Sequence, residues 1–165
     1  MEVIAKEAGV SKGLAYNYFV SKEELVGAAV KSWLQELSEL WTGVESESDP
    51  RAALATVIER YCDLLVRHPG RFRFYFDVFL DLDYVATIER AGGELPELQR
   101  QIEQVQKTST SLFGRLGASE PSNEVQFFRL LTAGLAAEYL MSEGALSLAA
   151  MKRRILAIYQ PEQKL

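Results

Sequence analysis

The sequence is poor in the residues that form disulfides and metal sites. It has one cysteine, Cys62, and one histidine, His68, so an internal disulfide cannot form and no metal site or cofactor is predicted. No apolar run approaches the roughly 18 residues of a membrane span, and no basic segment followed by an apolar run indicates a secretory signal. We therefore expect a reduced, cytoplasmic protein without a membrane partner.

An excess of positive charge is also missing. Eighteen Lys and Arg residues against 23 Asp and Glu residues give a net charge of −5, which excludes a protein whose whole surface binds nucleic acid. A local DNA-reading patch stays possible, although the three lysines of residues 1–24 are outnumbered by four glutamates. Since 48% of the residues are hydrophobic, the chain can build a real core and is not compositionally disordered.

No segment shows sustained two-residue alternation, so strands are not predicted. Apolar residues instead recur at three- and four-residue spacing, which is typical of helices, and the expected fold is all-α. We divide the chain into an N-terminal unit at 1–24 and a helical domain at 25–165. The expected helices are 2–8, 12–19, 22–42, a segment from Pro50 to the break at 68–70, 71–90, 96–116, 122–142 and 146–159.

The first two helices have the spacing of a helix-turn-helix. That motif needs a small residue where its helices cross, a Gly in the turn and an apolar residue after it; Ala5, Gly9 and Val10 supply them. Ser11 can then cap the second helix. The inward side of the first helix is predicted to carry Ile4, Ala5 and Ala8.

Residues 12–19 have the layout of a recognition helix. At about 100° per residue, Ala15 and Phe19 face the core, and Gly13 and Asn17 face outward with Leu14 beside them. Tyrosines at 16 and 18 lie on the two flanks, where hydroxyls can meet the phosphates on either side of a major groove.

The third helix has the best-specified start in the chain. Ser21 followed three residues later by Glu24 forms a capping box, and Val20 and Leu25 are placed for a hydrophobic staple.

These residues together resemble the DNA-binding signature of the TetR (tetracycline-repressor) family. The resemblance rests on 4–13, Tyr16, Tyr18-Phe19 and 21–25, within about residues 2–30. It implies an all-helical protein that dimerises through its last two long helices and holds a ligand pocket in its C-terminal domain. It also implies DNA-backbone contacts from Ser11, Lys12, Tyr16, Tyr18 and Lys22, with Gly13, Leu14 and Asn17 near the bases.

The sequence departs from the family pattern in two places. Leu14-Ala15 stands where the family often has Thr-Leu, which changes the expected base preference. The family also has a further helix before the one at 2–8, so we expect the sequence to be a truncated form of a longer protein with an incomplete three-helix DNA-binding domain. That helix would cover Ile4, Ala8, Val10 and Phe19.

Two surfaces in the helical domain carry further predictions. A group of aromatic residues could line a ligand pocket, although ordinary core packing is the alternative: Trp33, Tyr61, Phe72, Tyr75, Phe76 and Phe79, with Trp41 nearby. The last two helices are predicted to form a homodimer face, with packing inside one chain as the alternative: Leu131, Ala133, Gly134, Leu135, Ala137, Tyr139, Met151 and Ile155.

The function predicted from these features is a ligand-responsive, DNA-binding transcriptional regulator. The family resemblance favours a repressor, which a small apolar or amphipathic molecule releases from operator DNA. A helical module that binds protein instead of DNA is the alternative. An enzyme is not predicted, because no acid–base or nucleophile constellation is present.

Overall fold

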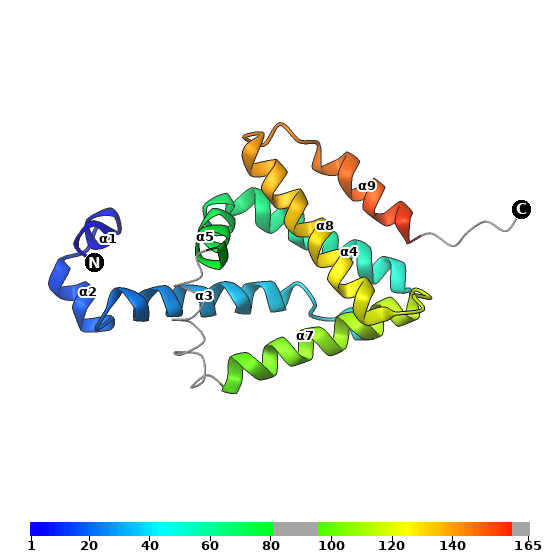
Figure 1. Cartoon of the computed structure of the whole chain (residues 1–165), viewed down its shortest axis with the longest axis horizontal. Helices are drawn as coiled ribbons and strands as arrows, with labels where there is room; N and C mark the ends of the chain where they lie inside the picture. Colours follow the sequence, from blue (N-terminus) through cyan, green and yellow to red (C-terminus); the bar gives the residue numbers. More distant parts are fainter. Residues whose placement is uncertain (81–95, 160–165) are drawn as a thin grey trace, which may run out of the picture.

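A computed structural model describes residues 1–80 and 96–159, without the side chains of Phe79 and 96–98. Every regular element in these ranges is helical (Figure 1). In chain order they are α1 (Glu2–Glu7), α2 (Lys12–Tyr18), α3 (Lys22–Glu39), a 3-10 helix η1 (Val44–Ser46), α4 (Pro50–Arg67), α5 (Pro69–Leu80), α7 (Pro96–Arg115), α8 (Pro121–Met141) and α9 (Leu148–Ile158).

The all-α prediction is confirmed, and each predicted helix is found with ends that differ by a few residues. Part of the predicted helix 71–90 lies outside the described residues. The short helix η1 was not predicted; it begins after Gly43, whose φ of 81° is the left-handed conformation that glycine adopts without strain.

Prolines and short polar side chains fix several helix starts. Pro50 and Pro121 occupy the first turns of α4 and α8, where a missing N–H costs no hydrogen bond. The carboxylate of Asp49 accepts a hydrogen bond of 2.9 Å from the backbone N–H of Arg51. These caps set where each helix begins, and therefore which residues face the core.

The long helix α3 connects the two parts of the molecule. Helices α1 and α2 lie at one end of α3, away from the other helices, while the rest of α3 runs beside α7 (Figure 1). Helix α7 packs on α8, and α4 contacts α7 and α9.

The core lies where α4, α7, α8 and α9 meet, and a second apolar cluster adjoins it. Leu54, Ile58 and Phe113 are fully buried in the first cluster. Burial of each such side chain stabilises the fold by about 1.5–3 kcal/mol. The second cluster, around Trp33 and Phe72, joins α3 to α5. No helix of the described part has the length and apolarity that a membrane span requires.

Candidate functional site

The turn between α1 and α2 has the backbone geometry that the sequence predicts. Gly9 adopts a φ of 68°, which a residue with a Cβ rarely tolerates. The backbone N–H of Val10 then donates a hydrogen bond of 2.9 Å to the carbonyl of Ala5. Because Ala5 is 2% exposed and small, the two helices can cross closely at this point.

Helix α2 presents one face to solvent. The hydroxyl of Ser11 caps it by accepting a hydrogen bond of 3.1 Å from the backbone N–H of Leu14. Tyr16 and Tyr18 are 45% and 71% exposed. The remaining predicted DNA-contact residues are all exposed as well, namely Ser11, Lys12, Gly13, Leu14, Asn17 and Lys22.

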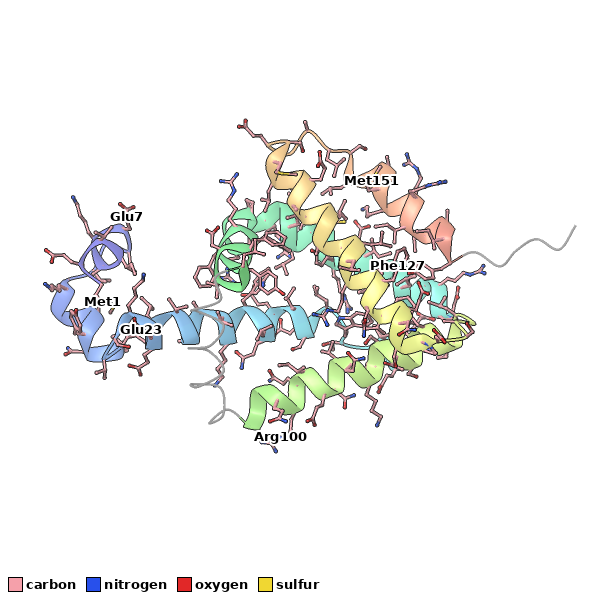
Figure 2. The ribbon with its side chains drawn as sticks, in the orientation of Figure 1. Met1, Glu7, Glu23, Arg100, Phe127 and Met151 are labelled. Carbon is pink, nitrogen blue, oxygen red and sulfur yellow. The ribbon has the colours of Figure 1, made fainter. Side chains whose placement is uncertain are left out.

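The inner side of α2 is covered only in part. Ala15 and Phe19, predicted to face the core, are half-buried. Ile4 and Ala8, which the sequence predicts on the inward side of α1, are exposed, as is Val10. The physical reason is that α1 makes its main contact with α2 alone, through Ala5. Side chains of α1 such as Glu7 project away from the other helices (Figure 2).

An ion pair partly neutralises the positive charge of α2. The Nζ of Lys12 lies 3.0 Å from a carboxylate oxygen of Glu2, and both side chains are exposed. Their hydrogen bond, and then the attraction of the opposite charges, lowers the pKa of Glu2 and raises that of Lys12. A phosphate that approaches Lys12 has to compete with Glu2.

The start of α3 is held by hydrogen bonds on both sides of its cap. The Ser21 hydroxyl accepts a hydrogen bond of 3.1 Å from the backbone N–H of Glu24, as a capping box requires. The Glu24 carboxylate accepts one of 2.6 Å from the N–H of Val20, and not from Ser21 as predicted. The first turn of α3 is therefore joined by two hydrogen bonds to residues 20 and 21, which connect it to α2.

A cavity of about 400 Å³ lies between α3, α4, α5, α7 and α8, and we call it the aromatic cavity. This volume falls in the range of small-molecule sites. Trp33 meets Phe72 edge to face at 4.7 Å between ring centroids, and Tyr61 meets Phe72 at 5.4 Å. Five predicted pocket residues line the cavity, namely Trp33, Tyr61, Phe72, Tyr75 and Phe76. The side chain of the sixth, Phe79, lies outside the described residues.

Helices α7 and α8 supply lining residues that the sequence did not reveal. Val105, Ser109, Phe128 and Thr132 belong to this group. They meet residues of α3 and α4 that are far away along the chain, and no local pattern predicts such a contact. The exposed Arg129 also lines the aromatic cavity, and its guanidinium has no partner in the part of the chain described.

A second cavity, of about 440 Å³, adjoins the first at the end of α3, and we call it the polar cavity. Its lining comes from the end of α3, the segment 42–46 and α7. Glu45 accepts a hydrogen bond of 2.9 Å from the hydroxyl of Thr108, which is itself buried. The sequence did not predict this cavity, because it depends on contacts between the segment 42–46 and α7, which lies far away along the chain.

The surface of α8 differs from the predicted dimer face. Leu135 and Ile155 are buried in the core of the chain, and Ala133 lines the aromatic cavity. Leu131, Ala137, Tyr139 and Met151 are half-buried, and Gly134 is exposed. The outward stripe, which we call the α8 seam, combines two predicted residues with three others at spacings of three and four: Phe127, Leu130, Gly134, Ala137 and Met141.

In comparisons with known proteins, residues 1–29 match the family described as bacterial regulatory proteins, tetR family. The matched residues comprise α1, α2 and the first part of α3. No curated protein and no solved structure matches the chain.

Proposed function

We propose that this chain, a DNA-binding transcriptional regulator of the tetR type by its N-terminal residues, is a repressor that leaves its operator when a small apolar or amphipathic molecule enters the aromatic cavity. The observation that carries the proposal is the continuity of α3. Its first turn is capped beside α2 at Ser21, and Trp33 and Leu37 farther along the same helix line the cavity. A rigid helix transmits a displacement at one end to the other.

On the DNA side, α2 is the recognition helix. Its exposed Gly13 lets the backbone approach the bases, and Leu14 and Asn17 are available for a thymine methyl and a base edge. The hydroxyls of Tyr16 and Tyr18 donate to phosphates. Lys12 and Lys22 add charge that attracts the backbone without reading its sequence.

A homodimer would place two such helices in successive major grooves, about 34–36 Å apart. The α8 seam supports this arrangement. Leu130 and Met141 are 71% and 73% exposed, and the alternating three- and four-residue spacing is that of helices that pack side by side. Gly134 and Ala137 allow close approach, and a two-fold axis would bring the same stripe of a second copy against it.

Ligand binding then acts by shifting populations. A molecule that fits the aromatic cavity in only one position of α3 stabilises that position. If the favoured position spaces the two recognition helices badly for the operator, DNA affinity falls by the same coupling free energy. We place the DNA-binding unit at residues 1–24 and the sensing and dimerisation unit at 25–165.

A gel shift with the full chain and the DNA upstream of its own coding sequence tests the proposal. We expect a complex that weakens steeply as salt increases, because bound Lys side chains displace counterions. Lys12→Ala should weaken this complex. Lys107→Ala removes the same charge at an exposed position of α7 and should leave the complex unchanged. Binding without salt dependence, or none at all, would favour the alternative of a protein-binding helical module.

A further inference from the structure

We propose that the aromatic cavity and the polar cavity form one binding site, and that its ligand has an apolar body and a protonated amine as head group. This inference rests on the proposed function, because it names the chemical class of the molecule that the chain would sense.

The two cavities share a wall. Ser38, Trp41, Gln101 and Val105 line both of them. The side-chain oxygen of Gln101 is buried in this wall and has no hydrogen-bond partner in the described part of the chain. A buried acceptor without a donor is unfavourable, so a ligand that moves the Gln101 side chain and donates a hydrogen bond to its oxygen is stabilised by that contact.

The polar cavity has the chemistry of a donor-binding pocket. Glu45 is the one charged residue among the described residues of its lining. One carboxylate oxygen of Glu45 accepts hydrogen bonds from the Thr108 hydroxyl at 2.9 Å and from the Gln104 side-chain amide at 3.5 Å, and no donor among the described residues contacts the other oxygen. The pocket therefore offers a negatively charged acceptor, and the Gln101 oxygen in the shared wall becomes a second acceptor if that side chain moves.

Trp41 also favours a cationic head group. It lines both cavities, and the face of an indole ring attracts a cation. An ammonium group beside Trp41 and Glu45 would therefore meet a ring face and a carboxylate together, while its apolar chain contacts the rings of the aromatic cavity. The net charge of the chain, −5, also attracts cations from solution.

Other head groups fit the polar cavity less well. A carboxylate would be repelled by Glu45, and an alcohol would gain no ionic attraction from it. Glu45 and Arg129 are both exposed, so solvent weakens the attraction of each. Arg129 lines the aromatic cavity alone, however, and Glu45 is the charge in the polar cavity, where the head group lies, which favours an amine.

The test compares decylamine, decanol and decanoic acid as probes of equal chain length. The chain has two tryptophans, Trp33 and Trp41, and both line the aromatic cavity, so intrinsic fluorescence of the unmodified full chain reports binding. We expect decylamine to bind about tenfold more tightly than decanoic acid, with decanol between them.

Substitutions identify the head-group contact. Glu45→Gln should reduce decylamine affinity roughly two- to fivefold, the range of an exposed ion pair, and leave decanol unchanged. Glu39→Gln, an exposed acid at the end of α3 that lines neither cavity, is the matched control. Circular dichroism of both variants checks that they are folded.

Three outcomes would overturn the proposal. Tightest binding of decanoic acid, or an unchanged decylamine affinity in Glu45→Gln, would refute the amine head group while the sensing function stands. No fluorescence change with any of the three probes would refute both the head group and the sensing role of the aromatic cavity.

Discussion

The hydroxyl of Tyr61 on α4 donates a hydrogen bond of 2.8 Å to the backbone carbonyl of Thr132 on α8. This bond joins two helices that belong to opposite sides of the aromatic cavity. It also fixes the Tyr61 ring against Phe72. Burial raises the pKa of Tyr61 well above its ordinary value, so the phenol stays a hydrogen-bond donor across the neutral range.

Tyr61→Phe should destabilise the fold. The substitution keeps the ring and leaves the Thr132 carbonyl without this donor, so we expect the free energy of unfolding to fall by about 0.5–1.5 kcal/mol. Urea denaturation followed by circular dichroism measures the change. Tyr18→Phe removes a hydroxyl from an exposed ring and serves as the control. Equal stability of Tyr61→Phe and the unsubstituted chain would contradict the role of this bond.

Ser21→Ala should loosen the start of α3. It removes the oxygen that accepts from the Glu24 N–H, and loss of such a cap costs about 1 kcal/mol. Because α1 and α2 are joined to the molecule through this turn, hydrogen exchange should increase at residues 20–26 more than in α4. Ser111→Ala, an exposed serine within α7, is the control. Unchanged exchange at the start of α3 would show that the cap is dispensable.

Local signals were enough to predict the helices and the exposed face of α2. Gly9, Ser11 and Ser21 act on neighbouring residues, so their effect can be read from the sequence. Whether Ile4 is covered could not be predicted from the sequence, because that depends on which helix packs against α1. The polar cavity depends on a contact between Glu45 and Thr108, which are 63 positions apart. Helical periodicity likewise places a residue such as Leu135 on a face of its helix, but it does not show whether that face packs inside the chain or against a second copy.

Glu2→Gln should strengthen DNA binding. It removes the carboxylate that pairs with Lys12, so the lysine no longer has to leave a partner to reach a phosphate. We expect tighter binding by a few fold at low salt, a difference that shrinks as salt screens both interactions.

Lys12→Ala should instead weaken DNA binding and reduce the magnitude of the slope of log affinity against log salt by about 1. Fluorescence anisotropy with a labelled duplex measures both, and Glu103→Gln on α7 is the charge-matched control. Identical affinities for Glu2→Gln and the unsubstituted chain would show that the ion pair does not compete with DNA.

The buried thiol of Cys62 should make stability depend on alkaline pH. Burial raises the pKa of Cys62 from 9.0 to about 11. Above pH 9 the unfolded chain loses the thiol proton while the folded chain keeps it, so the free energy of unfolding falls as pH rises toward 11. Below pH 9 this group contributes no slope.

Urea denaturation at pH 8, 9 and 10 checks this dependence. Cys62→Ala is less stable overall because it leaves a small cavity, but it should show a flatter profile between pH 9 and 10. Parallel profiles for Cys62→Ala and the unsubstituted chain would mean that other groups cause the alkaline loss.

Leu130→Glu should convert the proposed dimer into monomers. Leu130 is a 71% exposed residue of the α8 seam, so a charge there costs the single chain little. In a two-fold interface the same substitution would bury two carboxylates next to an apolar stripe, and each would lose its hydration without gaining a partner. Sedimentation equilibrium should therefore give the monomer mass at concentrations where the unsubstituted chain has twice that mass.

Arg153→Glu, at an exposed position on α9, tests whether any added acid has the same effect. A Leu130→Glu chain that stays dimeric would place the interface elsewhere. A monomeric variant that still binds operator DNA with full affinity would separate dimerisation from DNA recognition, because one recognition helix reads only half of a two-fold site.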